Sequence, residues 1–121
     1  MLTPEQVFSV HHDIIVAVYG TVKGEVIFRD VSPRTVNARL RGPPSDITLA
    51  FDLRAENLTE MQKRLSPFTG AMECLIGCYE QFNELIVFHG EKYLVSVFTK
   101  ETDVQTMRNS SDKLRNLLAE A

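Results

Sequence analysis

The sequence of 121 residues is poor in the residues that mark secreted or membrane proteins. It has only two cysteines, Cys74 and Cys78, too few and too close in sequence for the disulfide framework of a small secreted domain. No apolar run approaches the roughly 20 residues of a membrane-spanning helix. The first dozen residues also lack the basic start and apolar run of a signal peptide. We therefore expect a cytoplasmic protein that does not insert into a membrane.

Positive charge is also scarce. The net charge is −3, whereas a nucleic-acid binder of this size is usually basic. With 44% hydrophobic and 24% charged residues, the composition is that of an ordinary globular protein. The length fits one core, so we expect a single α+β domain spanning residues 1–121.

Catalytic motifs are missing as well. The six glycines form no phosphate-binding loop, and no serine lies in a Gly-x-Ser-x-Gly elbow. We therefore predict no catalytic residue and no cofactor. One cluster of residues could bind a metal: His11, His12 and Asp13. We expect these residues at the end of a short helix that begins at Thr3-Pro4. Because adjacent side chains on a helix point roughly 100° apart, we expect a polar helix terminus and no metal.

β-Branched residues and alternating patterns predict five strands. One hairpin is expected from Ile14–Val22 and Glu25–Val31, and a second from Glu84–His89 and Tyr93–Thr99. A further strand is expected at Ile47–Leu53. The first strand is apolar on both faces, which indicates a central position. A terminal helix should open near Thr102-Asp103. These elements predict a central antiparallel sheet of about five strands with helices on both faces.

A long helix is expected from Asn57 to Phe82. Its apolar residues are spaced alternately three and four apart: Leu58, Met61, Leu65, Phe68, Met72, Leu75, Tyr79 and Phe82. Pro67 either kinks this helix or starts a second one after Ser66, and the unbroken spacing favours the kink. Small residues beside the stripe, at Gly70, Cys74, Gly77 and Cys78, should allow close packing.

The apolar surface of this helix is wider than one sheet face can cover, which favours a protein partner and most simply a second copy. We expect the interface in its second half, at Phe68, Gly70, Met72, Cys74, Leu75, Cys78, Tyr79 and Phe82. Arg34, Arg39 and Arg41 concentrate positive charge in a loop. They are either solvated loop residues or a docking site for an acidic partner.

The second half of the chain resembles the roadblock / dynein-light-chain family. The resemblance covers LSPFTGAMECLIGCYEQF, ELIVFHGEKYLVSVFTKETD and VQTMRNSSDKLRNLLAEA, with a hairpin turn at His89–Tyr93. The Ile14–Val31 hairpin matches the first two strands of the family, whereas residues 32–56 depart from its pattern. The resemblance implies a profilin-like sandwich that dimerises and has a non-catalytic role in regulating or scaffolding small GTPases or motor complexes.

Two other classes of function stay open. A small-molecule-sensing domain would need a pocket between the sheet and a helix. An enzyme without a recognisable motif would need polar side chains that converge around a cleft.

Overall fold

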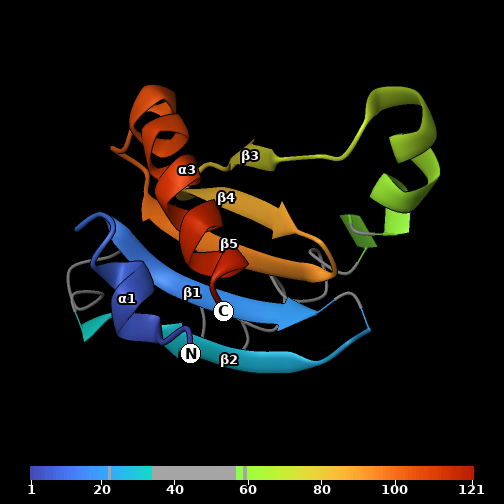
Figure 1. Ribbon diagram of the computed structural model, residues 1–121. Helices are drawn as coiled ribbons and strands as arrows, with labels where there is room; N and C mark the ends of the chain where they lie inside the picture. Colours follow the sequence, from blue (N-terminus) through green and yellow to red (C-terminus); the bar gives the residue numbers. More distant parts are fainter. Residues whose placement is uncertain (22, 34–56, 59) are drawn as a thin grey trace.

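The computed structural model describes residues 1–21, 23–33, 57–58 and 60–121. Its centre is a five-stranded antiparallel sheet with the strand order β2-β1-β5-β4-β3. The strands are β1 (Ile14–Thr21), β2 (Val26–Val31), β3 (Cys74–Cys78), β4 (Phe82–His89) and β5 (Lys92–Thr99). Helices α1 (Pro4–Phe8) and α3 (Val104–Ala119) lie across one face of this sheet (Figure 1). The predicted α+β class with a central antiparallel sheet is confirmed.

Both predicted hairpins are present. β1 pairs with β2 and β4 pairs with β5, and the central contact of the sheet is between β1 and β5. Residues 14–20 of β1 are all buried, as expected for a strand apolar on both faces, and β2 lies at an edge. The sheet therefore has β2 at one edge and β3 at the other.

Two hydrophobic cores form, one on each face of the sheet. The core under α1 and α3 includes Phe98, Met107 and Leu114, none of which is accessible to solvent. The opposite core includes Val18, Ile86 and Val95 from three neighbouring strands. Leu58, from the described helical residues 57–58, packs against this second core. The sheet is thus covered by α1 and α3 on one face and contacted by a third helical segment on the other.

Local capping signals position α1 and α3. The hydroxyl of Thr3 accepts from the backbone N–H of Gln6 at 3.3 Å, and the side chain of Gln6 accepts from the N–H of Thr3 at 2.8 Å. This capping box confirms the predicted start of α1. α3 is capped by Asp103, one residue later than Thr102. None of the described helices is long and apolar enough to cross a membrane.

The predicted long helix from Asn57 to Phe82 is wrong in its second half. Residues 60–69, which we call the 60–69 helix, are helical, and the helix ends at Gly70. Gly70 has a φ of 77°, and its N–H donates to the carbonyl of Ser66 at 2.9 Å, the usual arrangement after a helix C-terminus. Residues 74–78 then form β3, and Phe82 opens β4.

Pro67 lies inside the 60–69 helix, so the alternative of a new helix starting there is wrong. Proline cannot donate to the carbonyl of Lys63 one turn earlier. The hydroxyl of Ser66 donates to that carbonyl at 3.4 Å and satisfies it in part. The helix therefore tolerates Pro67. The strand predicted at Ile47–Leu53 lies outside the described residues.

The cap of α3 gives a pH-dependent prediction. The carboxylate of Asp103 accepts from the N–H of Thr106 at 2.7 Å, and this backbone hydrogen bond lowers the pKa of Asp103 from its usual value of 3.8. A lowered pKa means that the cap stabilises the fold above the pKa of the unfolded state and is lost as pH falls through the folded pKa.

We expect Asp103→Ala to lower the melting temperature by a few degrees at pH 7, because the first turn of α3 loses its acceptor. Asp103→Asn keeps an acceptor that does not titrate, so it should match the wild type at pH 7 and lose less stability below pH 4. Thermal unfolding of the three proteins between pH 3 and pH 7 measures both effects. Equal losses in the wild type and in Asp103→Asn on acidification would contradict the assignment.

Candidate partner interface

The outer edge of β3 carries backbone groups for which the described part of the chain supplies no hydrogen-bonding partner. The N–H of Tyr79 donates to the carbonyl of Phe82 at 2.9 Å, and the N–H of Phe88 donates to the carbonyl of Glu73 at 3.3 Å. In an antiparallel ladder, residues that bond to the neighbouring strand alternate with residues whose N–H and C=O point the other way. Since residues 73 and 79 bond toward β4 and the register has no bulge, the backbone groups of residues 74, 76 and 78 point away from β4.

Within the described residues, β3 (CLIGC) carries neither charge nor proline. Charges and proline are the two commonest guards of an edge strand against pairing with another chain. By contrast, the opposite edge strand, β2, carries Arg29 and Asp30, both exposed. A neutral, apolar edge strand is a template for the addition of another strand.

Gly77 has a specific packing role in β3. It pairs with Glu84 of β4, and a Cβ at Gly77 would lie only 2.7 Å from Oε1 of Glu84. The hydroxyl of Tyr79 donates to the same oxygen at 2.9 Å. Glu84 is completely buried, so the absence of a side chain at residue 77 makes room for its carboxyl group on this face of the sheet.

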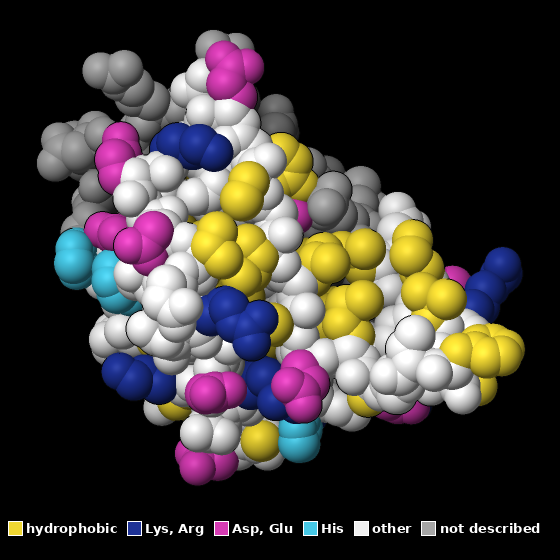
Figure 2. Space-filling model, turned by 90° about the horizontal axis from the view of Figure 1, so that it is seen from above, with side chains coloured by type: hydrophobic (Ala, Val, Ile, Leu, Met, Phe, Trp, Pro, Cys, Tyr) yellow, Lys and Arg dark blue, Asp and Glu magenta, His cyan; other side chains and the backbone are white. Residues whose placement is uncertain are grey.

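The 60–69 helix, which precedes β3 in the chain, carries three exposed apolar side chains. Phe68 is 88% exposed, Met61 52% and Leu65 44%, and their spacing of four and three places them on one face of the helix. The helix stands off the sheet at one end (Figure 1). Figure 2 looks down on the side of the molecule where β3 and this helix lie and shows hydrophobic side chains gathered there. We call Met61, Leu65 and Phe68 the helix patch.

The predicted interface residues divide into three groups. Phe68, Gly70 and Cys78 are exposed, and Gly70 ends the helix that carries Phe68. Cys74 is half-buried and packs toward the core under α3. The other four are half-buried and pack against the core on the opposite face: Met72, Leu75, Tyr79 and Phe82. The idea that small residues form a helical stripe is wrong, because Cys74, Gly77 and Cys78 lie in a strand.

Two residues of the helix patch, Met61 and Leu65, were not among the predicted interface residues. Their apolar spacing is visible in the sequence, but the predicted helix continues past Gly70. Because the helix ends at Gly70, its exposed apolar face lies in the first half of the predicted helix. Arg34, Arg39 and Arg41 lie outside the described residues, so the docking site predicted there stays a prediction.

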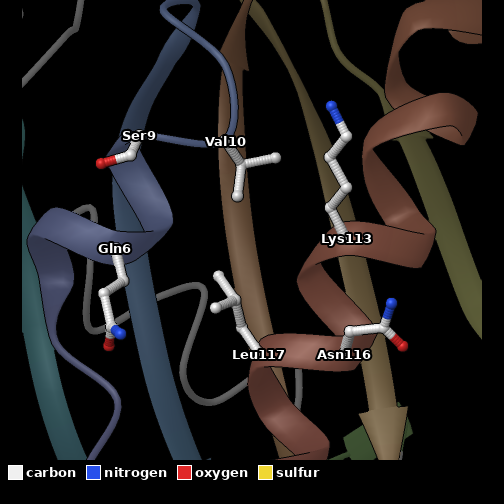
Figure 3. Close-up of a pocket in the computed structure, with 6 residues that line it drawn as sticks. All are labelled: Gln6, Ser9, Val10, Lys113, Asn116 and Leu117. Carbon is white, nitrogen blue, oxygen red and sulfur yellow. The ribbon is translucent and has the colours of Figure 1, made fainter.

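Two hollows lie on the α3 side of the described structure. An open groove of about 490 Å³ runs between α1 and α3, and Val10 and Leu117 form its apolar floor (Figure 3). Gln6, Lys113 and Asn116 line its sides, and no histidine, cysteine or carboxylate is among its lining residues. The groove therefore offers an open contact surface with one charged side chain, Lys113, on its wall.

The second hollow, of about 340 Å³, lies between α3 and the chain leading into β3 and is strongly polar. Arg108 and Arg115 line it together with Glu73 and Asp112. The Nη1 atom of Arg115 lies 3.9 Å from Oε2 of Glu73, and its Nε donates to the carbonyl of Phe88 at 3.5 Å. Arg115 thus links α3 to the β3–β4 end of the sheet.

No family model and no curated protein sequence matches the chain. Solved structures do resemble it. MglB from Myxococcus xanthus has a TM-score of 0.64 at 15% identity, covering 97% of this chain and 94% of MglB. A Roadblock/LC7 domain from Streptomyces avermitilis has a TM-score of 0.62 at 11% identity, covering 98% and 99%. Profilin IA from Acanthamoeba castellanii has a TM-score of 0.57 at 14% identity, covering 94% of each chain. These likenesses establish a roadblock/profilin-like fold.

Proposed function

We propose that this chain, which has the roadblock/profilin-like fold, is a single roadblock-like domain over residues 1–121 that acts as a non-catalytic, cytoplasmic interaction module. It forms a homodimer and regulates or scaffolds a small GTPase or a multiprotein complex. The observation that carries the proposal is the uncharged edge strand β3, together with the exposed helix patch that precedes it in the chain.

The two surfaces supply different parts of a dimer contact. Outward N–H and C=O groups of β3 offer directional hydrogen bonds to a second strand. The helix patch adds apolar area, which supplies most of the free energy of association. A symmetric pair of β3 strands would join the two sheets into one and cover the β3 edge of each chain. The exposed Cys78 lies at the end of this edge.

A small GTPase as partner is supported by the roadblock resemblance of the sequence together with the fold shared with MglB and the Roadblock/LC7 domain. The non-catalytic role is supported by the resemblance of the sequence to the roadblock family.

The oligomeric state tests the proposal directly. We expect the wild type to sediment at twice the chain mass at micromolar concentration. Cys78→Pro removes an outward N–H without touching the residues that bond to β4, so it should shift the protein to monomer by at least about tenfold in dissociation constant. Ile27→Pro, in the opposite edge strand, is the matched control and should stay dimeric. A monomeric wild type would contradict the homodimer.

The partner requires a second arm of the same experiment. Wild type and Cys78→Pro are used as baits in cell extract loaded with either GDP or a non-hydrolysable GTP analogue. We expect a small GTPase enriched in one nucleotide state with the wild type and depleted with the variant. Capture of the same proteins in both nucleotide states, with no GTPase among them, would favour a scaffold in a complex of another kind.

A further inference from the structure

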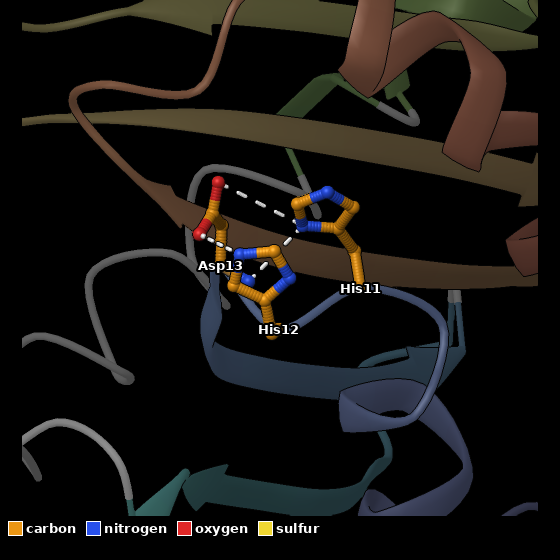
Figure 4. A group of neighbouring side chains, drawn as sticks. All are labelled: His11, His12 and Asp13. Carbon is orange, nitrogen blue, oxygen red and sulfur yellow. Dashed lines mark hydrogen bonds and ion pairs between the residues drawn. The ribbon is translucent and has the colours of Figure 1, made fainter.

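His11, His12 and Asp13 do not lie on a helix, contrary to the sequence-based expectation. α1 ends at Phe8, and the carbonyl of His11 accepts from the N–H of Ile14 at 3.2 Å, so the three residues form a turn that leads into β1. Adjacent side chains diverge on a helix, but in this turn they can point toward one another. The two imidazole rings stack, with centroids 4.5 Å apart and planes inclined by 21° (Figure 4).

The turn brings three potential metal ligands together. One ligand atom from each of His11, His12 and Asp13 lies within 4.8 Å of the others. The Nε2 atom of His12 is 3.1 Å from Oδ1 of Asp13, and the Nδ1 atom of His11 is 3.8 Å from Oδ2. Ligands at about 2.0–2.2 Å from a tetrahedral zinc ion are roughly 3.3 Å from one another, so only small side-chain shifts separate this arrangement from a coordinating one.

The carboxylate is held in place from behind. The hydroxyl of Thr102, a buried residue, donates to Oδ2 of Asp13 at 2.8 Å, and the N–H of Thr99 donates to the carbonyl of Asp13 at 3.1 Å. Hydrogen bonds of this kind orient metal-binding carboxylates and raise metal affinity. The turn before β1 is thereby fixed to the segment between β5 and α3.

The surroundings of the two imidazoles differ. The Nδ1 atom of His11 accepts from the N–H of Asp13 at 3.0 Å, so a metal ion bound at this nitrogen would replace that hydrogen bond. The ring also packs against Phe98 at 6.0 Å between centroids, which limits its motion. The side chain of His12 is 78% exposed, which leaves an open side for water ligands.

We propose that His11, His12 and Asp13 form a surface site for one divalent transition-metal ion of the zinc type. Two imidazoles and one carboxylate favour Zn²⁺ and its neighbours over Mg²⁺ or Ca²⁺, which prefer oxygen ligands. Three protein ligands leave at least one coordination position for water. Metal binding would fasten the turn before β1 and stabilise the folded chain.

Calorimetric titration of the untagged full chain with zinc chloride tests the site. All titrations use a Cys74→Ser/Cys78→Ser variant, which we call the background and in which the single variants are made. It lacks the two thiols, which are the other strong zinc ligands in the chain. We expect one zinc ion per chain, and His12→Ala should weaken binding at least about tenfold, because it removes one of three ligands. The matched control is His89→Ala, which removes the third histidine of the chain and should bind as the background does.

Melting temperatures measured with and without zinc distinguish a loss of zinc binding from a loss of folding. His12 is exposed, so its replacement should not change the melting temperature of the metal-free protein. Zinc should raise the melting temperature of the background and of His89→Ala but not of His12→Ala. Thr102→Val should bind zinc more weakly, although it alters no ligand. Equal zinc affinity in His12→Ala and His89→Ala, or no zinc binding by the background, would overturn the proposal.

Discussion

Replacing Gly20 with alanine should lower the free energy of unfolding by about 1–3 kcal/mol or more. Gly20 lies in β1, where the register with β2 shifts between Tyr19 and Gly20. A Cβ at this position would be 2.5 Å from the hydroxyl oxygen of Tyr93, 2.7 Å from its Cζ and 2.8 Å from the carbonyl of Glu25. Tyr93 is fully buried, so neither its ring nor the backbone at Glu25, just before β2, can move away without loss of packing.

Gly77→Ala is the matched control for this prediction. Its Cβ would also be too close to a neighbour, but that neighbour is the end of one side chain, Glu84, and no backbone atom is involved. We therefore expect a smaller loss in urea unfolding. A double-mutant cycle of Gly20→Ala with Tyr93→Phe should give a positive coupling, because the variant at residue 93 removes the nearest atom. A Gly20→Ala protein as stable as the wild type would show that the contact is relieved elsewhere.

Placing a carboxylate in the helix patch should abolish dimerisation at micromolar concentration. Phe68 is 88% exposed in the single chain. Its burial in a dimer contributes about 1.5–3 kcal/mol, equivalent to roughly ten- to hundredfold in dissociation constant. Phe68→Asp removes this contribution and adds the cost of desolvating a charge. We expect the variant to sediment as a monomer with a thermal unfolding curve close to that of a monomeric Cys78→Pro.

Ile27→Asp provides the control for Phe68→Asp. Ile27 is 48% exposed and lies on β2, at the opposite edge of the sheet, so the same change from apolar to acidic should leave the dimer intact. A dimer that survives Phe68→Asp but not Cys78→Pro would place the contact on the strand edge alone. Survival of both variants would move the interface away from this side of the molecule.

The helix ends at Gly70, although the apolar spacing in the sequence continues beyond it. Apolar residues at Met72, Leu75, Tyr79 and Phe82 continue the helical spacing of the residues before them, and a short apolar run cannot by spacing alone be assigned to helix or strand. In the structure Leu75 packs on one face of the sheet and Cys74 and Ile76 on the other, the alternation of a strand. The glycine at residue 70 was the available signal, since a left-handed residue often follows a helix C-terminus.

The sequence by itself determined the elements whose signals are local. The Thr3 capping box, the turns at Lys23-Gly24 and Gly90-Glu91, and the doubly apolar β1 each follow from neighbouring residues, and the structure contains all of them. Together with the predicted terminal helix they indicate the α+β class. These elements formed as predicted because the local signals agree with the packing of the whole fold.

Only the tertiary structure decided the two candidate sites. β3 is a strand because β4 offers it a hydrogen-bonding partner and because Gly77 leaves room for the buried Glu84. The metal-ligand turn depends on Thr102, 89 residues from Asp13 in the sequence, whose hydroxyl holds the carboxylate. Both arrangements rest on contacts between segments far apart in the chain, and residue spacing carries no information about such contacts until the chain has folded.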